Sequence, residues 1–450
     1  MNKKIDISPI SGFPEFLPEE QIVFDWAKQI IKESYEKVGA TPIETAAVER
    51  LDVLLSKGGN NKEIYGIHRA ADGDKAKKEL GLHFDLTVPL ARYVSYHSSS
   101  LVFPFKRYQI QPVWRGERAQ AGRYRQFYQC DIDVIGNESL SLFYDAEMPY
   151  VIWDIFKKMN IGDFKIHINN RKILRSLFTK LELKEYHVGR VLKIIDDYCG
   201  INSEKNLSET ESALLKEGIT QNSTNKIIDF FDSTSSMTNK DTLKFLADEK
   251  SLSSNTEGLY ELDSVYQHLL AMGMDEKNIQ LDLRIARGLD YYTGTIYETK
   301  LESNPGLGSI CSGGRYDNLT QYFSNRKLPG VGISIGLTRL IPNLIREGIL
   351  QANTKTTAEV LIANLSYNHS IDYIKLGTQL RNSGINTEVY LEDRKVGKQL
   401  EYANKKGFKV VLFKGEDEFN RNTVTLKDMR SGEQYECSDE LILEKIKAII

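Results

Sequence analysis

The sequence predicts an α+β fold built on an antiparallel sheet that is flanked by helices. Three stretches alternate apolar and polar residues with the period of two that is typical of strands, at 82–87, 108–115 and 126–136. Few helical patterns separate these stretches, which favours antiparallel pairing over a doubly wound parallel sheet. The length of 450 residues and the hydrophobic content of 41% predict two or three domains with proper cores.

A helix is predicted first, over 17–38, because apolar residues recur there at three- and four-residue spacing before Gly39. A short strand at 65–67 then opens the strand-rich part of the chain. From about 174 to 273 the pattern becomes charged and mostly helical, with a polar interruption at 232–236. No motif there carries recognisable chemistry, so we interpret it as a domain inserted between two halves of the sheet.

The sheet resumes at Gln280 and closes with a glycine-bearing strand at 330–336, followed by a helix that starts near Leu337. A polar linker follows at 351–357. Beyond it, strands alternate with helices, which predicts a compact α/β domain. The predicted divisions are 1–173 and 275–349 for the two parts of the core, 174–274 for the insertion, 350–357 for the linker and 358–450 for the C-terminal domain. In that last domain strands are expected at 360–362, 387–391 and 408–413, and helices at 371–381 and 397–406.

Composition excludes several classes of protein. The formal net charge of −3 provides no global basic field, so a nucleic-acid site must come from local clusters. Neither a signal peptide nor a membrane-spanning run is apparent, and no membrane partner is expected. The cysteines are scattered and form no Cys-x-x-Cys pair, which predicts reduced thiols in a cytoplasmic protein and no zinc site. They are Cys130, Cys199, Cys311 and Cys437.

The segment Arg-Gly-Leu-Asp-Tyr-Tyr-Thr-Gly at 287–294 combines a guanidinium group, two glycines and adjacent tyrosines. This composition suits a pocket that holds an anion beside an aromatic, hydrogen-bonding wall. Taken alone, an ordinary strand with a turn explains it equally well. A second segment, Cys-Ser-Gly-Gly-Arg-Tyr-Asp at 311–317, follows soon after. Together the two segments resemble the paired signature sequences of histidyl-tRNA synthetases.

The segment 115–127 holds four arginines and one acid between two predicted strands, and it predicts a hairpin with a basic loop. A solvated hairpin tip is the ordinary explanation of such a charge run. However, an arginine at a strand end and an aromatic residue on the returning strand suit a nucleotide. The segment resembles motif 2 of class II aminoacyl-tRNA synthetases. This resemblance implies that Arg115 contacts the α-phosphate of ATP and Glu117 the adenine amino group, while Arg123 reaches the outer phosphates and Phe127 stacks on adenine.

Two more segments resemble class II motifs. The strand and helix start at 330–339 resemble motif 3, which implies that Arg339 lies against ATP on the γ-phosphate side, under the adenine. Motif 1 falls near 41–54, but Ala46 stands where class II enzymes normally carry a proline, and Pro42 comes four residues earlier. That proline shapes the dimer interface, so the resemblance implies a homodimer whose interface differs in detail.

A free α-ammonium group needs buried acceptors, because an unpaired charge in a pocket is costly. The segment 85–93 resembles the eukaryotic-type branch of the family. Each acid, taken singly, is also explained as a surface carboxylate at a strand end. The resemblance implies that the ammonium of histidine is held by Asp85, Thr87 and Gln129, that its imidazole is read by Asp133 and Tyr292, and that Tyr291 lines the same pocket.

The resemblance extends over nearly the whole chain and implies a histidine–tRNA ligase. L-histidine would attack the α-phosphorus of ATP, and the histidyl group would then pass to the 3′ end of histidine tRNA. The catalytic residues would be Arg115 and Arg287, with Mg²⁺ bridging the outer phosphates. In the hairpin loop, Arg118 and Gln120 would meet the acceptor end of the tRNA. The C-terminal domain would bind the anticodon, with a basic cluster around one helix that a solvated helix face also explains.

Two rival functions follow from the same sequence. A non-catalytic paralogue, such as an ATP phosphoribosyltransferase regulatory subunit, shares the catalytic fold but usually lacks the C-terminal domain and the arginine signature. A tRNA-binding or sensor module without catalysis is the second rival. Arg287 and the predicted C-terminal domain argue against the first rival, and Arg115, Arg287 and Arg339 argue against the second. Pyrophosphate exchange that depends on histidine separates both rivals from the ligase.

Overall fold

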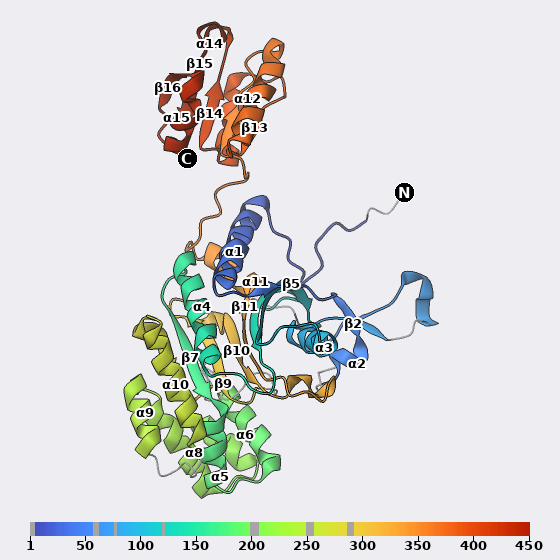
Figure 1. Ribbon diagram of the computed structural model, residues 1–450, viewed down its shortest axis with the longest axis vertical. Helices are drawn as coiled ribbons and strands as arrows, with labels where there is room; N and C mark the ends of the chain where they lie inside the picture. Colours follow the sequence, from blue (N-terminus) through green and yellow to red (C-terminus); the bar gives the residue numbers. More distant parts are fainter. Residues whose placement is uncertain are drawn as a thin grey trace. The chain divides into compact units, whose positions relative to one another are not determined.

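The computed structural model describes residues 5–56, 63–75, 79–118, 122–198, 207–248, 256–285 and 292–450. The chain divides into two compact units, Met1–Glu15 with Ala27–Ile349 and Phe16–Trp26 with Leu350–Ile450. Figure 1 shows the elements of each unit in the order of the chain. No helix in these described ranges is long and apolar enough to cross a membrane.

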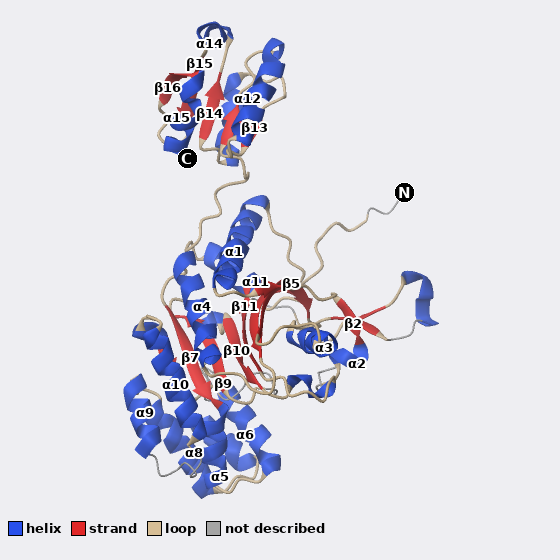
Figure 2. Cartoon of the chain, in the orientation of Figure 1, coloured by secondary structure: helices blue, strands red, loops and turns tan. Residues whose placement is uncertain are grey.

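The larger unit is built on an eight-stranded sheet in the order β1-β5-β6-β11-β10-β9-β7-β8. Figure 2 draws its strands in red, with helices around them in blue. Neighbours pair antiparallel except at the two edges, where β1 pairs with β5 and β7 with β8 in parallel. The predicted antiparallel sheet is therefore confirmed. The strands are β1 (Thr41–Pro42), β5 (Phe105–Trp114), β6 (Gln126–Ile135), β7 (Phe164–Asn170), β8 (Ile279–Leu281), β9 (Thr295–Leu301), β10 (Cys311–Tyr316) and β11 (Gly330–Gly336).

A small second sheet precedes the long hairpin, and it corrects one prediction. The strand expected over 82–87 ends at Leu82, and residue 87 already begins a helix. The Asp85 carboxylate accepts a hydrogen bond of 3.0 Å from the backbone N–H of Val88, and Pro89 lies in the first turn, where a missing N–H costs nothing. Capping chemistry thus overrides the alternating pattern. The elements are β2 (Val48–Arg50), α2 (Leu51–Leu54), β3 (Gly66–Ile67), β4 (Leu80–Leu82) and α3 (Thr87–His97).

Helices flank the large sheet. The helix predicted over 17–38 is confirmed as α1 (Pro18–Lys37), and the one predicted near Leu337 is α11 (Leu337–Arg346). The helix α4 (Phe143–Met159) packs against β11 and β6, and α11 packs against β6. Because α11 directly follows β11, its first turn is fixed at the end of the central strands.

A group of helices stands between β7 and β8 in the chain and gathers beside β7 and β9 (Figure 1). Ile166 of β7 lies opposite Ile279 of β8, so the chain leaves the sheet and returns to it at the same edge. The polar stretch at 232–236 lies partly inside a helix, which runs on to Thr234. The helices are α5 (Arg171–Lys180), α6 (Glu185–Tyr198), α7 (Leu207–Lys216), α8 (Gln221–Thr234), α9 (Asn239–Asp248) and α10 (Glu257–Ala271).

The C-terminal unit has a five-stranded sheet in the order β13-β12-β14-β15-β16. The first three strands are parallel and alternate with helices, in keeping with the predicted α/β domain, and the last two extend the sheet by antiparallel pairs that were not predicted. Alternate residues of β12 enter two apolar cores: Val360 and Ile362 in one, Leu361 in the other. The elements are β12 (Val360–Ile362), α12 (Ser370–Asn382), β13 (Thr387–Val389), α13 (Val396–Lys406), β14 (Val410–Phe413), α14 (Glu416–Arg421), β15 (Thr423–Asp428), β16 (Gln434–Ser438) and α15 (Ile442–Ile449).

Candidate active site

The central strands share one polar face. Residues two apart on a strand point to the same side, so Gln129, Asp131 and Asp133 of β6 lie on one face of the sheet. The pairing register places them opposite small residues of β11, in the pairs Gln129–Gly336, Asp131–Ser334 and Asp133–Gly332. On the other side they lie opposite Gln111, Gln109 and Arg107 of β5. The sheet itself therefore lines up polar side chains from three neighbouring strands.

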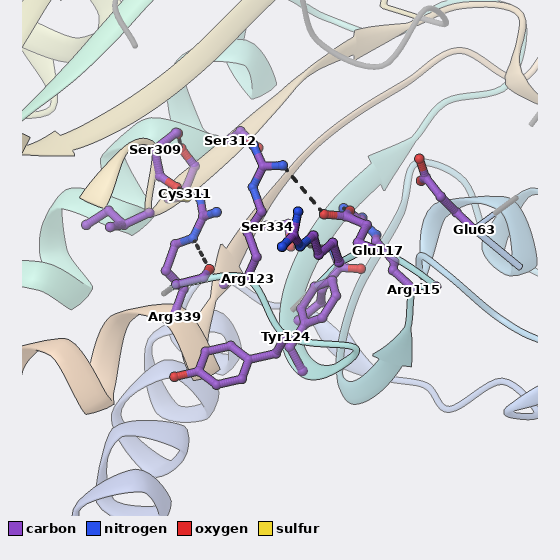
Figure 3. A pocket seen from close by; sticks show the side chains of 17 residues that line it. Glu63, Arg115, Glu117, Arg123, Tyr124, Ser309, Cys311, Ser312, Ser334 and Arg339 are labelled. Atoms are coloured by element: carbon purple, nitrogen blue, oxygen red, sulfur yellow. Dashed lines mark hydrogen bonds and ion pairs between the residues drawn. The ribbon is translucent and has the colours of Figure 1, made fainter. Parts of the chain in front are cut away.

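A pocket with a volume of about 700 Å³ opens over the outer end of this face (Figure 3). That volume is typical of a small-molecule site. Its walls include the hairpin loop between β5 and β6, the start of β10, and the junction of β11 with α11. Four arginines and two glutamates line it, so its charge suits an anionic ligand. Among the predicted site residues, the lining includes Arg115, Glu117, Arg118, Arg123, Phe127, Gln129 and Arg339.

Arg115 follows the last residue of β5, and its guanidinium is held in place. Its Nε donates a hydrogen bond of 3.0 Å to the carbonyl of Phe84. The guanidinium carbon lies 5.0 Å from the centroid of the Phe127 ring, and Nη1 lies 3.9 Å from Glu117 Oε1. A cation fixed in this way is preorganised to meet an anion in the pocket.

Two more guanidinium groups face the same space in Figure 3. Arg339, in the first turn of α11, donates from Nε to the carbonyl of Gly122 at 2.8 Å and from Nη1 to the carbonyl of Ser309 at 2.9 Å. Arg123 Nη1 lies 3.9 Å from Glu117 Oε2. Burial, and then the nearby Arg123 cation, lower the pKa of Arg339. This repulsion between neighbouring cations is what a bound polyphosphate would relieve.

The residues predicted to hold the amino-acid ammonium differ in their access to the pocket. Gln129 lines the pocket and donates from Nε2 to the Ser334 hydroxyl at 3.0 Å. Asp85 is buried beside the start of α3, and Thr87 is the half-buried first residue of that helix. The pocket lining therefore includes Gln129 but not the other two.

Asp133 is buried, and both of its oxygens are engaged. Arg107 Nη2 lies 2.7 Å from Oδ2, and the Tyr316 hydroxyl donates to Oδ1 at 2.6 Å. Burial raises the pKa of the Asp133 carboxyl group, and the Arg107 cation opposes that shift. Arg107 itself is fully buried in β5. Asp133 and Arg107 therefore form a charge pair inside the floor of the site.

Glycines on β10 and β11 leave room for the side chains of this floor. A Cβ atom built on Gly332 would lie 2.0 Å from Asp133 Oδ1, and one on Gly330 would lie 2.3 Å from the Tyr316 ring. A Cβ on Gly314 would lie 2.9 Å from the Tyr292 ring. For Gly330 and Gly332 the close neighbours are side chains of the protein.

Three predicted site residues, Arg287, Tyr291 and Gln120, lie outside the described residues. Tyr292 is described: its ring packs beside Gly314 and its carbonyl accepts a hydrogen bond of 2.8 Å from Arg171 Nη1. Arg118 lines the pocket from the exposed hairpin. Within the described ranges, no group of three or more histidine, cysteine, aspartate or glutamate side chains could hold a metal ion.

Sequence reasoning missed several residues of the site. Ser309, Ser312 and Ser334 line the pocket, and Asp131 and Arg107 lie in its floor. A signal for Asp131 was present, because it lies midway between two predicted residues on a strand of period two. The serines carried no comparable signal, since they become neighbours only through strand pairing.

The chain matches known proteins over its whole length. A family model described as histidyl-tRNA synthetase matches residues 12–340, and one described as an anticodon binding domain matches 359–449. The histidine–tRNA ligase of Trichormus variabilis is 45% identical over 99% of this chain and 98% of its own length, and that of Clostridium tetani is 44% identical over 99% of both. The solved structure of histidyl-tRNA synthetase from Nostoc sp. PCC 7120 is 43% identical, with a TM-score of 0.89, over 99% of this chain and 100% of that one.

Proposed function

This chain belongs to the histidyl-tRNA synthetase family, and we propose how its residues carry out the reaction of that family. The chain is an aminoacyl-tRNA synthetase that joins histidine to tRNA with ATP as co-substrate. One observation supports the assignment of residues: the predicted nucleotide ligands, drawn from the hairpin loop after β5, from β6 and from α11, converge on one pocket. Convergence of distant segments is what a built site requires.

In this proposal ATP binds beneath the hairpin loop. The adenine stacks on Phe127, and its amino group meets Glu117. Arg115 contacts the α-phosphate, Arg123 reaches the outer phosphates, and Arg339 lies against the nucleotide from the α11 side. Planar guanidinium groups suit phosphate oxygens because they donate two parallel hydrogen bonds.

Mg²⁺ accompanies the nucleotide in this proposal. Glu63 and Glu117 are the carboxylates among the described lining residues. Such a sparse donor set fits Mg²⁺, which is usually held by substrate phosphates, waters and one or two carboxylates. When bound, the ion would neutralise charge on the outer phosphates, and Glu63 would help to hold it, since Glu117 is assigned to the adenine amino group.

The first step forms histidyl-adenylate. A carboxylate oxygen of histidine attacks the α-phosphorus, and the bond to the departing pyrophosphate breaks. Negative charge grows on the α-phosphoryl oxygens, so a cation already fixed beside them lowers the barrier. Arg115 is fixed in this way by Phe84 and Phe127. Arg287 takes the opposite side of the α-phosphate by its match to the family signature.

Histidine lies deeper on the polar face than ATP does. Its ammonium is held by Asp85, Thr87 and Gln129, where acceptors replace the lost water. Its ring faces Asp133 and Tyr292, with Tyr291 on the same wall. Asp85 and Asp133 are both buried, which supports their assignment to a pocket from which water is excluded.

The second step transfers the histidyl group to the terminal ribose 3′ hydroxyl of histidine tRNA, and AMP leaves. The exposed hairpin, with Arg118 and Gln120, contacts the acceptor end. The domain at 358–450 binds the anticodon, in keeping with the family model that matches it. The remaining divisions stand as 1–173 and 275–349 for the catalytic core, 174–274 for the insertion and 350–357 for the linker.

The protein acts in the cytoplasm as a homodimer formed by the catalytic unit. Tyr96, Val102 and Tyr322 are exposed by 78%, 83% and 53%, and the short helical turn with Tyr322 packs on α3, which carries Tyr96. Exposed apolar side chains on adjoining segments support an interface. Light scattering on the purified protein measures the mass and thus tests the dimer.

The decisive experiment is ATP–pyrophosphate exchange with each of the twenty amino acids. Exchange that depends on histidine alone is the expected result. Exchange with no amino acid, together with retained binding of histidine or tRNA, would favour the non-catalytic paralogue. Exchange with a different amino acid would contradict the histidine pocket.

A further inference from the structure

Asp131 lies in the middle of the polar row on β6, and the mechanism above does not use it. Its side chain is 3% exposed. It lies on the same strand face as Gln129 and Asp133, opposite Ser334 on β11 and Gln109 on β5. Gln129 and Ser334 both line the pocket. Asp131 is therefore a buried acid directly beneath two residues that a ligand would touch.

The hydrogen bonds around Ser334 show which atoms are left to act as acceptors. Gln129 Nε2 donates to the Ser334 hydroxyl at 3.0 Å, and Ser334 hydrogen-bonds in turn to the Asp131 carboxylate. A hydroxyl has one proton, so Ser334 accepts from Gln129 and donates to Asp131. Gln129 Oε1 and Asp131 Oδ1 remain, both buried and neither with a partner in the described part of the chain. Two adjacent buried acceptors of this kind call for a donor.

Asp133, two residues along the strand, differs in this respect. Arg107 and Tyr316 engage its two oxygens, and Arg107 Nη1 also donates to Gln109 Oε1 at 3.2 Å. Gln109 Nε2 in turn donates to the Thr45 hydroxyl at 2.9 Å. The buried cation of this region is thus held beside Asp133. Of the two acids, Asp131 is the one that retains a buried oxygen for a further partner.

The surroundings of Asp131 match its acidity to that of an imidazole. Burial raises the pKa of Asp131 to about 7, against the opposing effect of Arg107 and with further increases from Asp133 and Asp85. An ordinary histidine side chain titrates at ~6.5, so the raised pKa moves the acidity of Asp131 toward that of an imidazole. The Asp131 charge also helps to raise the pKa of three neighbouring groups, namely Cys130, Cys311 and Tyr35.

Building on the proposed function, we propose that Asp131 is a further histidine-binding residue whose Oδ1 accepts a hydrogen bond from the imidazole N–H of the substrate. Gln129 is assigned to the ammonium, and Asp131 lies roughly 7 Å farther along β6, away from the hairpin and the nucleotide. The group that extends from the ammonium in this direction is the side chain. Asp131 thereby distinguishes histidine from amino acids whose side chains cannot donate.

A binding acid of this kind weakens the empty protein. The pKa of Asp131 is higher in the folded state than in the unfolded state. The folded protein therefore loses stability as the pH rises between the two values, here from about 4 to about 7. At pH 8 that loss is complete, so Asp131→Asn should melt at or above the wild-type temperature. The advantage should vanish below about pH 4. Asp133→Asn should melt lower, because it leaves Arg107 without its buried counter-charge.

Histidine-dependent pyrophosphate exchange with the full-length variants at pH 8 tests the binding role. Asp131→Asn should raise the KM for histidine by about 10- to 100-fold and leave the KM for ATP close to wild type, because a neutral amide replaces the charged acceptor of the imidazole N–H. An unchanged KM for histidine overturns the proposal, and so does an equal rise in both KM values. An inactive wild-type protein would instead contradict the proposed function, before any variant is compared.

Calorimetry that measures the binding of histidine and of its two ring-N-methyl forms identifies which imidazole nitrogen donates to Asp131. Methylation of the nitrogen that meets Asp131 should weaken binding to wild type strongly and to Asp131→Asn much less. The other methyl form should weaken binding to both proteins alike. If neither methyl form distinguishes the two proteins, Asp131 does not contact the imidazole, and the proposal fails even where the KM for histidine has risen.

Discussion

The arginines of the pocket differ in what holds them. Arg115 and Arg339 donate to backbone carbonyl groups and stand ready before a ligand arrives. Arg123 is 56% exposed and meets Glu117 at a distance of 3.9 Å. An exposed long side chain loses rotamer freedom when a phosphate orders it, which offsets part of its contribution. Arg115 should therefore contribute more to the reaction than Arg123.

Replacing Arg115 with alanine should lower the rate of histidine-dependent pyrophosphate exchange by about 10²–10³, since a fixed donor at the developing charge is lost. Lysine should restore only part of the rate, because it lacks the planar fork. Arg421→Ala is the matched control: it removes an exposed arginine paired with Glu436 in the C-terminal unit. A near-normal rate in Arg115→Ala would remove Arg115 from the catalytic set.

Residue by residue, the sequence predicted which side chains of β6 share a face, because alternation is a local property. Gln129 and Asp133 lie on one face of β6, as their spacing requires. The partner of Asp133 was not predictable in this way. Arg107 reaches it across the β5–β6 register, and Tyr316 comes from β10, which is remote in sequence. Only strand pairing determines such contacts.

Among the elements, β11 shows how a strand can be shaped by its neighbour's side chains. Gly330 and Gly332 stand on the face where Tyr316 and Asp133 need space. Helix α1 was predicted close to its observed bounds and α11 close to its first residue, because periodicity and boundary residues are local. The strands β15 and β16 were missed, since they join the C-terminal sheet as an antiparallel extension of a parallel pattern.

Gly332→Ala should disturb the floor of the site. Its new Cβ would lie 2.0 Å from Asp133 Oδ1, so the Arg107–Asp133 pair must shift. We expect a loss of about 1–3 kcal/mol in the free energy of unfolding and a rise in the KM for histidine. Gly189→Ala is the control, because Gly189 lies within α6 with nothing within 4 Å of an added Cβ. Equal stability of the two variants in urea denaturation would contradict the packing argument.

The hairpin between β5 and β6 should affect the tRNA step separately from activation. Arg118 is exposed, and its loss should weaken aminoacylation more at low salt than at high salt, as expected for a phosphate contact that salt screens. Pyrophosphate exchange of Arg118→Ala should stay near wild type, because that assay contains no tRNA. Comparable losses in both assays would place Arg118 in the nucleotide site instead.

On the scale of the whole molecule, the second unit has its own sheet and its own apolar cores. Its predicted basic cluster is largely neutralised. Lys398 and Lys405 both pair with Glu401, while Lys406 pairs with Glu388 and Lys409 with Glu359. Exposed pairs of this kind are weak, so the solvated-face interpretation of the cluster gains support. Anticodon binding must rest on other surfaces of the domain as well.

Truncation after Gln351 should separate the two activities of the chain. Histidine-dependent pyrophosphate exchange should remain measurable, because the pocket lies within the larger unit. Charging of histidine tRNA should fall strongly, since single-stranded anticodon bases lose the surface that reads them. The comparison uses full-length and truncated protein on tRNA with a native and an altered anticodon. If the full-length protein charges both tRNAs equally well, and truncation leaves charging unaltered, the domain has another role.

The order of strands in the large sheet also determines when the site can form during synthesis. The strand β6 pairs with β5 as soon as the hairpin leaves the ribosome, but its other neighbour is β11, which is about 200 residues later in the chain. At typical rates of translation this interval lasts roughly 10–40 s. During that time the edge of β6 that will pair with β11 has no partner strand. A nascent chain stalled before residue 330 should therefore expose this edge to chaperones and bind no histidine.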